Sequence, residues 1–136
     1  MTELSWKDPF IRVVEEVLSP AECVGLIARV EALGPTVAPI TTHRGFELRP
    51  DIRNNTRVMF DDPALAARLF AKVRAVIPAE LEGMAPVGAN ERLRCYRYQS
   101  GQYFAPHFDG SFIRNLGEKS LLTLMVYLTE RRGRPR

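Results

Sequence analysis

The sequence predicts an α+β domain in which helices cover one face of a sheet or of a partial jelly roll. Two observations lead to this prediction. Segments with helical periodicity dominate the first part of the chain, and runs rich in strand-forming residues follow them. The 136 residues are a usual length for one domain with a single hydrophobic core. We therefore expect one domain over residues 1–136.

The first expected elements are a strand and a helix. Residues 10–18 are rich in Val and Ile, which favours a strand. Ser19 and Glu22 then form an S-x-x-E capping box, with Pro20 at the first helical position. Gly34-Pro35 is a typical helix end. Between these signals one helical face carries Cys23, Leu26, Ile27, Val30 and Leu33.

A second helix is expected from Asp62-Pro63 to about Ile77, before Pro78. Its apolar stripe consists of Leu65, Leu69, Val73, Val76 and Ile77. Between the two helices the sequence predicts short strands over residues 36–42 and 57–60. The polar loop from Arg49 to Asn55 separates them, and we interpret it as a candidate lid.

Strand-forming runs dominate the rest of the chain. After a Pro- and Gly-rich connection over residues 78–90, we expect strands at 92–98, 102–109 and 120–128. Helices followed by antiparallel strands are typical of an α+β domain. This order is the basis for the predicted layer of helices against a sheet.

Composition excludes several classes of protein. Apolar residues make up 46% and charged residues 26% of the chain, as in ordinary soluble globular proteins, and no run is long enough to span a membrane. The C-terminal arginines carry more than the whole net charge of +3, and no aromatic residues lie among them. We therefore expect residues 131–136 to be a disordered basic tail rather than a nucleic-acid interface.

Cysteine usage and the N-terminus favour a cytoplasmic protein. Cys23 and Cys95 form no CxxC pair and no disulfide framework, which suits a reducing compartment. Both fit small buried thiols better than reactive ones. The first ten residues lack the pattern of a secretory signal peptide.

The candidate metal ligands are His107 and Asp109. Side chains two positions apart on a strand project from the same face, so an imidazole and a carboxylate could meet at one ion. They would supply two of the three ligands of a 2-His-1-carboxylate iron site. Taken alone, the H-x-D tripeptide is more often an exposed pair or a satisfied hydrogen bond.

The surrounding residues give this tripeptide a context. Residues 98–110 read Y-x-x-G-Q-x-F-x-P-H-x-D-G, and S-L-L-T-L-M-V-Y-L follows at 120–128. This pattern resembles the prolyl-4-hydroxylase-like branch of the 2-oxoglutarate/iron(II) dioxygenase superfamily. L-S-P-A-E-C at 18–23 and I-R-N-N-T-R-V at 52–58 look like the same branch. The resemblance covers about residues 10–130 and implies a double-stranded β-helix, or jelly roll.

The resemblance also implies roles for individual residues. His107 and Asp109 would be iron ligands, and Tyr98 and Tyr127 would contact the cosubstrate 2-oxoglutarate. Thr123 and Met125 share the face of Tyr127 by strand alternation, so we expect them in the same cavity. The competing interpretation makes Tyr98, Met125 and Tyr127 ordinary core residues.

The implied activity is hydroxylation of a C–H bond by O₂, with Fe(II) and 2-oxoglutarate. Ascorbate is a further candidate cofactor. The substrate class is a peptide or a small molecule, and a peptidyl proline is the first candidate by analogy. Neither nucleic acid nor a membrane is expected as a partner.

The sequence departs from that branch at its C-terminal side. In complete members a second ligating histidine and a basic anchor for 2-oxoglutarate follow the Y-L strand, whereas Arg131–Arg136 stand here. His43, the other histidine, lies too early and is expected at the surface. We therefore expect an incomplete domain, with an exposed strand edge available for association. The alternative function is a non-catalytic remnant or an interaction module.

Overall fold

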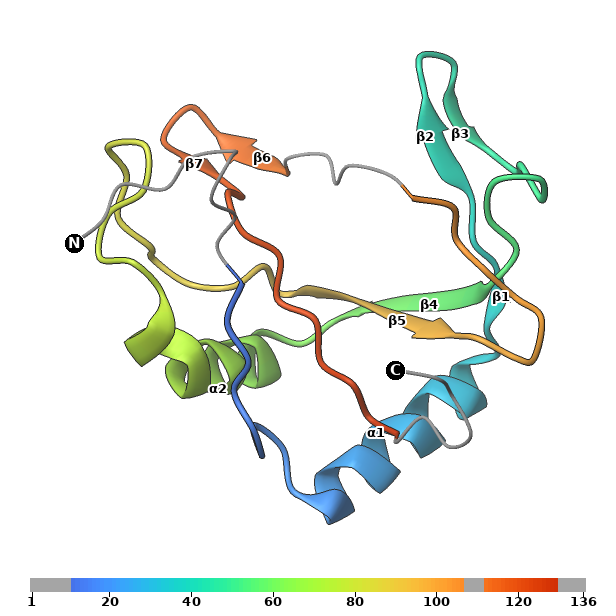
Figure 1. Cartoon of the computed structure of the whole chain (residues 1–136), viewed down its shortest axis with the longest axis horizontal. Coiled ribbons are helices and arrows are strands. Elements are labelled where there is room, and N and C mark those ends of the chain that lie inside the picture. Colours follow the sequence, from blue (N-terminus) through green and yellow to red (C-terminus); the bar gives the residue numbers. More distant parts are fainter. Residues whose placement is uncertain (1–10, 107–111, 130–136) are drawn as a thin grey trace.

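The computed structural model describes residues 11–106 and 112–129, which form an α+β domain (Figure 1). Two helices and three small antiparallel sheets make up this part of the chain, as the predicted α+β class requires. The helical elements are α1 (Pro20–Leu33), α2 (Pro63–Val73) and the 3₁₀ helix η1 (Arg74–Val76). The strands are β1 (Thr36–Val37), β2 (Ile40–Thr42), β3 (Gly45–Glu47), β4 (Thr56–Asp61), β5 (Arg92–Arg97), β6 (Ile113–Asn115) and β7 (Glu118–Lys119).

The predicted caps of α1 are confirmed. Glu22 N donates to Ser19 Oγ at 3.1 Å, and Ser19 N donates to Glu22 Oε1 at 3.0 Å, so the capping box is reciprocal. Gly34 ends the helix with φ 74°, a left-handed conformation that glycine adopts without steric cost. Local chemistry therefore determines both ends of α1.

The second helix begins as predicted and ends in a tighter turn. Asp62 Oδ1 accepts a hydrogen bond from Leu65 N at 3.0 Å, and Pro63 is the first helical residue. Helix α2 ends at Val73, and η1 continues the helical path to Val76. The predicted end near Ile77 is therefore confirmed to within one residue for the combined segment.

The main sheet has the order β1-β4-β5, with β4 in the centre. Strand β1 pairs with β4 over two residues, whereas β5 pairs with β4 over six. The predicted strands at 57–60 and 92–98 are confirmed as β4 and β5, each to within one residue at either end. Beyond the two-residue ladder with β1, one edge of β4 has no strand partner among the described residues.

Both helices lie on one face of this sheet, as predicted (Figure 1). The Arg29 guanidinium of α1 lies 3.9 Å from the centroid of the Phe60 ring on β4. Arg97 of β5 pairs with Glu31 of α1 at 2.7 Å. Arg68 of α2 pairs with Glu22 of α1, so the helices also contact each other.

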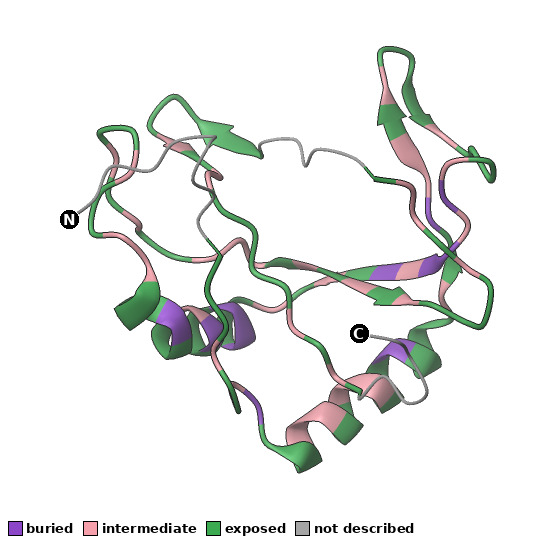
Figure 2. Ribbon diagram, in the orientation of Figure 1, coloured by how far each residue is buried: buried purple, intermediate pink, exposed green. Residues whose placement is uncertain are grey.

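The hydrophobic core lies where the helices meet the C-terminal segment. Its buried centre is Leu18, Leu65 and Leu69. The partly buried residues packed against it are Val17, Cys23, Leu26, Leu93, Val126 and Leu128. Figure 2 shows that the buried positions gather on the inner side of α2 and along β4. The core is small, so each buried leucine contributes a large share of it.

Three predicted strands are corrected by the structure. Residues 11–18 contain a turn and no strand, because Val17 and Leu18 pack into the core while Ile11 and Val13 are exposed. Residues 102–106, the described part of the predicted strand 102–109, pair only through a single bridge between Arg53 and Phe104. Residues 120–128 are not assigned as a strand either. No helix in the described ranges is both long and apolar enough to cross a membrane.

The hairpin β6–β7 was not predicted. Its turn is held by Gly117 N, which donates to Asn115 Oδ1 at 2.8 Å. Arg114 ties the hairpin to the start of β5 through a two-bond ion pair with Glu91, at 2.6 and 3.1 Å. This hydrogen-bonded guanidinium lowers the pKa of Glu91 to about 2.

Replacement of a core leucine tests the packing of α2. Leu69→Ala should lower the free energy of unfolding by about 2–5 kcal/mol, because it leaves a cavity in the centre of the core. Leu116→Ala is the matched control, since Leu116 is fully exposed at 110% and its loss should cost less than about 0.5 kcal/mol. Urea unfolding followed by circular dichroism measures both, and equal losses would contradict this core.

Acidification tests the Glu91–Arg114 pair. The folded pKa of Glu91 is depressed, so the pair stabilises the hairpin above the ordinary value of 4.5, and this contribution is lost as pH falls towards 2. Carboxyl NMR titration should give a pKa near 2 in the wild type and a higher value in Arg114→Gln, since the largest cause of the depression is removed. Arg74→Gln, a charge-matched control on η1, should leave the titration unchanged. A wild-type value that Arg114→Gln does not alter would refute the pair.

Candidate functional site

The two predicted metal ligands, His107 and Asp109, lie outside the described residues. The structure describes the segment that leads to them, residues 99–106. It begins with a turn in which Gln102 N donates to Gln99 O at 2.9 Å and Gln99 N donates to Gln102 Oε1 at 2.9 Å. Gly101 occupies this turn with φ 83°, where a side chain would be strained. The glycine of the sequence motif is thus explained by backbone conformation.

Hydrogen bonds join this segment to the loop that precedes β4. Asn54 N donates to Tyr103 O at 3.0 Å, and Tyr103 N donates to Asn54 Oδ1 at 2.7 Å. Ala105 N donates to Ile52 O at 2.8 Å. The Tyr103 hydroxyl lies 2.6 Å from the Asp51 carbonyl, which can accept its hydrogen bond. These contacts bring together two stretches that lie about 50 residues apart in the sequence.

A buried polar pair lies at the centre of this junction. Arg53 is 5% exposed and Asn55 is completely buried. Arg53 Nε donates to Asn55 Oδ1 at 2.7 Å, and Asn55 Nδ2 donates to Thr56 O at 3.2 Å. The guanidinium lies 4.1 Å from the Phe104 ring centroid and 4.5 Å from that of Tyr96. The C-terminal end of the Arg49–Asn55 loop is therefore anchored in the framework, while Arg49 and Asp51 are exposed.

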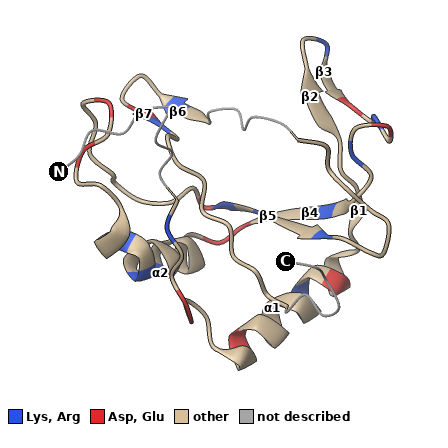
Figure 3. Cartoon of the chain, viewed as in Figure 1, with Lys and Arg blue, Asp and Glu red and all other residues tan. Residues whose placement is uncertain are grey.

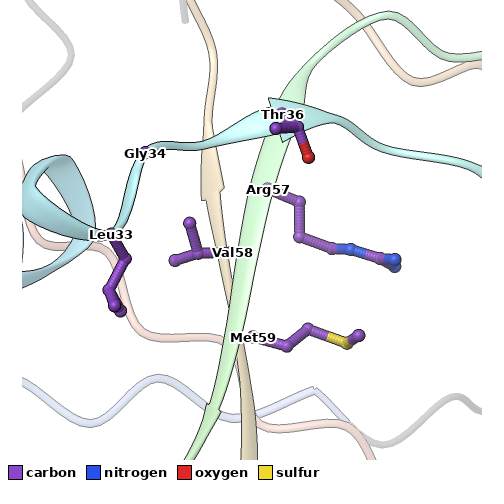
Figure 4. A pocket seen from close by; sticks show the side chains of 6 residues that line it. All are labelled: Leu33, Gly34, Thr36, Arg57, Val58 and Met59. Carbon is purple, nitrogen blue, oxygen red and sulfur yellow. The ribbon is translucent and has the colours of Figure 1, made fainter.

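The sheet face remote from the helices carries basic and aromatic side chains. Strand register places Arg57 opposite Tyr96 and Met59 opposite Arg94, and these positions alternate with residues that face the helices. Figure 4 shows the side chains of Arg57 and Met59 pointing to one side of β4 and Val58 to the other. Figure 3 shows basic residues on both β4 and β5. Burial lowers the pKa of Arg57, and the charges of Arg53 and Arg94 lower it further, against an opposing effect of Tyr96.

Two shallow openings follow the edge of β4. The first has a volume of about 330 Å³ and the second about 400 Å³. The first is lined by Leu33, Gly34, Thr36, Arg57, Val58 and Met59 (Figure 4). The second is lined by Met59, Phe60, Asp61 and Arg92. Neither is lined by a residue predicted to hold a metal or a cosubstrate.

The four predicted cosubstrate residues are exposed. Tyr98 is exposed by 49%, Met125 by 62% and Tyr127 by 68%, and Thr123 is also at the surface. In the C-terminal segment it is Val126 and Leu128 that contact the core, so the alternate residues face outward. Core packing therefore does not account for Met125 and Tyr127. Their role toward a cosubstrate stays a prediction, as do those of Tyr98 and Thr123.

The remaining candidates have no catalytic arrangement. His43 is exposed in the turn between β2 and β3, as predicted. Cys23 and Cys95 are free thiols, and burial raises the pKa of Cys95, which makes it a weak nucleophile. Within residues 11–106 and 112–129 no group of three or more His, Cys, Asp or Glu side chains is arranged to hold a metal.

Sequence reasoning missed the Arg53–Asn55 pair. Buried polar residues follow no apolar periodicity, so their burial depends on neighbours from elsewhere in the chain. The available signal was the I-R-N-N-T-R stretch, where two asparagines and an arginine directly precede a predicted strand. As part of a polar loop, this stretch gave no reason to expect that Arg53 and Asn55 are buried.

Replacement of Asn55 tests the junction. Asn55→Ala removes the acceptor of Arg53 Nε in a buried site, so unfolding free energy should fall by about 1–3 kcal/mol. Hydrogen exchange at the amides of Tyr103 and Ala105 should accelerate at least tenfold, because their acceptors belong to the same loop. Asn115→Ala, at an exposed turn, is the control. Unchanged exchange in Asn55→Ala would show that the junction does not hold residues 99–106.

Comparison of the chain with protein-family models, with curated proteins and with solved structures finds no match. The likeness to prolyl-4-hydroxylase-like enzymes therefore rests on the motif residues themselves. Function is accordingly a proposal, argued from those residues and from the contacts around them.

Proposed function

We propose that this chain carries the iron- and 2-oxoglutarate-binding part of a C–H hydroxylase of the prolyl-4-hydroxylase type. One observation supports the proposal most. Two of the stretches that resemble this branch, residues 52–58 and 98–110, are joined by hydrogen bonds between residues 52–54 and 103–105, immediately before His107. A motif shared only by chance gives no reason for its separate parts to meet in the fold.

The donor chemistry fits ferrous iron. His107 offers an imidazole nitrogen and Asp109 a carboxylate oxygen, the mixed donor set of facial-triad iron sites. When bound, iron together with 2-oxoglutarate and O₂ would supply the oxidising power for hydroxylation. The chain's own part is to hold the two donors in place, and the bonds from Ile52 and Asn54 to residues 103–105 serve that purpose.

The same proposal extends to the fold. We interpret the β1-β4-β5 sheet, covered by helices on one face, as part of a double-stranded β-helix. Its helix-free face would be the inner face of the jelly roll, and Tyr98 follows β5 in alternation with Tyr96 on that face. Tyr98 and Tyr127 would donate hydroxyl hydrogen bonds to 2-oxoglutarate, with Thr123 and Met125 beside them. The substrate class is a peptide or a small molecule with a reactive C–H bond.

Ligand replacement tests this function. His107→Ala and Asp109→Ala should each weaken ferrous iron binding by at least about tenfold to a hundredfold, because each removes a direct donor. His43→Ala is the matched control and should bind iron like the wild type. Anaerobic iron titration measures affinity, and succinate release with 2-oxoglutarate, O₂ and ascorbate measures turnover. Equal iron affinity in all three variants would refute the proposed ligands.

The second candidate function is a non-catalytic remnant or interaction module. The observation that favours it is the exposure of large apolar side chains in the C-terminal third, namely Phe112, Ile113, Leu116, Leu122, Leu124, Met125 and Tyr127. Such a module should bind iron weakly and release no succinate, while light scattering should show association. The same titration therefore separates the two functions.

A further inference from the structure

We propose that the free edge of β4, from Met59 to Asp61, binds an extended acidic segment of a partner protein as an added β-strand. Three features support this: the direction of the backbone hydrogen-bonding groups of β4, the point at which β1 ends, and the charge around the edge. None of them involves a predicted iron ligand or a residue predicted to contact 2-oxoglutarate.

The backbone of β4 directs unused hydrogen-bonding groups to this edge. Asp62 N donates to Glu91 O, which directly precedes β5. Because such directions alternate along an antiparallel strand, Phe60 also faces β5, whereas Met59 and Asp61 direct an N–H and a C=O each to the opposite edge. No described strand pairs with Met59 or Asp61 at that edge.

Strand β1 leaves this edge free because helix α1 ends directly before it. The ladder between β1 and β4 stops where Thr36 pairs with Arg57. Its register would place Gly34 opposite Met59, but Gly34 caps α1 with φ 74° and Pro35 has no N–H to donate. A separate strand can therefore continue the ladder from the point where β1 stops.

The surface beside this edge has room for the side chains of such a strand. The openings of about 330 Å³ and about 400 Å³ share Met59 in their linings, so they adjoin along the edge. Leu33 and Val58 lie to one side of the first opening, and Arg57 and Met59 point to the other (Figure 4). Phe60 lines the second opening. Alternate side chains of an added strand would thus meet apolar surface on the helix side and a cation on the helix-free side.

The charges around the edge favour an acidic strand. Among the paired positions of β4 and β5 on the helix-free face there are three arginines and one carboxylate, namely Arg57, Arg92, Arg94 and Asp61. Asp61 pairs with Arg92 at 3.0 Å. Neither Arg57 nor Arg94 forms an ion pair with a described carboxylate. A glutamate opposite Met59 would be a diagonal neighbour of Arg57, a separation that long side chains can span.

The occupant is therefore an extended peptide that runs antiparallel to β4, with a glutamate between two apolar residues. Main-chain hydrogen bonds would supply its affinity and the alternate side chains its specificity. A second copy of this chain fits less well, because pairing two β4 edges would bring the same excess of arginines together from both sides.

A fluorescein-labelled peptide, Thr-Val-Glu-Val-Thr with a blocked C-terminus, tests the site by fluorescence anisotropy, with a chelator and without iron. N-methylation of its glutamate removes an N–H directed at β4 and should weaken binding at least about tenfold. N-methylation of the valine that follows, whose N–H points away from β4, is the matched control and should leave binding unchanged. Both changes lie in the peptide, so the fold of the protein is the same in every measurement.

The charge is tested with the same peptide. Replacement of its glutamate by glutamine should weaken binding about twofold to fivefold. Arg57→Gln should abolish this difference between the two peptides, whereas Arg74→Gln on η1 should preserve it. His107→Ala should bind the peptide like the wild type, so a failure here is distinct from a failure of iron binding.

Hydrogen exchange gives a second measurement on the protein itself. Saturating peptide should slow exchange of the Met59 and Asp61 amides at least about tenfold and leave that of Phe60, which faces β5, unchanged. The proposal is overturned if the two N-methylated peptides bind equally or in the reverse order, or if the glutamine peptide binds as tightly as the glutamate peptide. A dimer that protects Met59 and Asp61 while no peptide binds would also overturn it and would assign the edge to a second copy.

Discussion

The buried pair of Arg53 and Asn55 is the interaction on which the arrangement of strands and site depends. Asn55 uses its side-chain oxygen for Arg53 and its side-chain nitrogen for the Thr56 carbonyl, while its backbone oxygen accepts from Ala38 at the end of β1. Only a side chain with both a donor and an acceptor can do this in a fully buried position. Through the Arg53–Asn55 pair, the β1–β2 connection, β4 and the segment before His107 are held together, since Arg53 also lies against the Phe104 ring.

The main sheet separates two kinds of electrostatic environment. On the helix side, arginines are paired with carboxylates of α1 or with the cap of α2, so charge there supports packing. On the other side Arg92 pairs with Asp61, whereas Arg53, Arg57 and Arg94 form no ion pair with a described carboxylate, and two aromatic rings lie against Arg53. The ion pairs between the sheet and the helices are therefore confined to the first face.

Sequence reasoning succeeded where the determinants are local. The capping box at Ser19, the Asp62-Pro63 helix start and the alternating run of β5 each contain their own signal, and all three were predicted. It failed where structure depends on a distant partner. Residues 11–18 have strand propensity, but Val17 and Leu18 pack into the core and the segment joins no sheet. Residues 120–128 have an alternating pattern but gain no ladder. The candidate metal ligands His107 and Asp109 were predicted from a motif. The buried Arg53 and Asn55, which lie beside the segment before His107, follow no periodic pattern in the sequence.

The junction between residues 52–54 and 103–105 has a consequence for how the chain folds. Its hydrogen bonds join residues 49 positions apart, as between Asn54 and Tyr103, whereas the bonds of α1 and α2 span only a few residues. Closing so long a loop carries an entropic cost before any contact repays it. The helices should therefore form early and the junction late, with the rate-limiting barrier in between. Partly folded chains would then contain helices while the segment leading to His107 is still unattached.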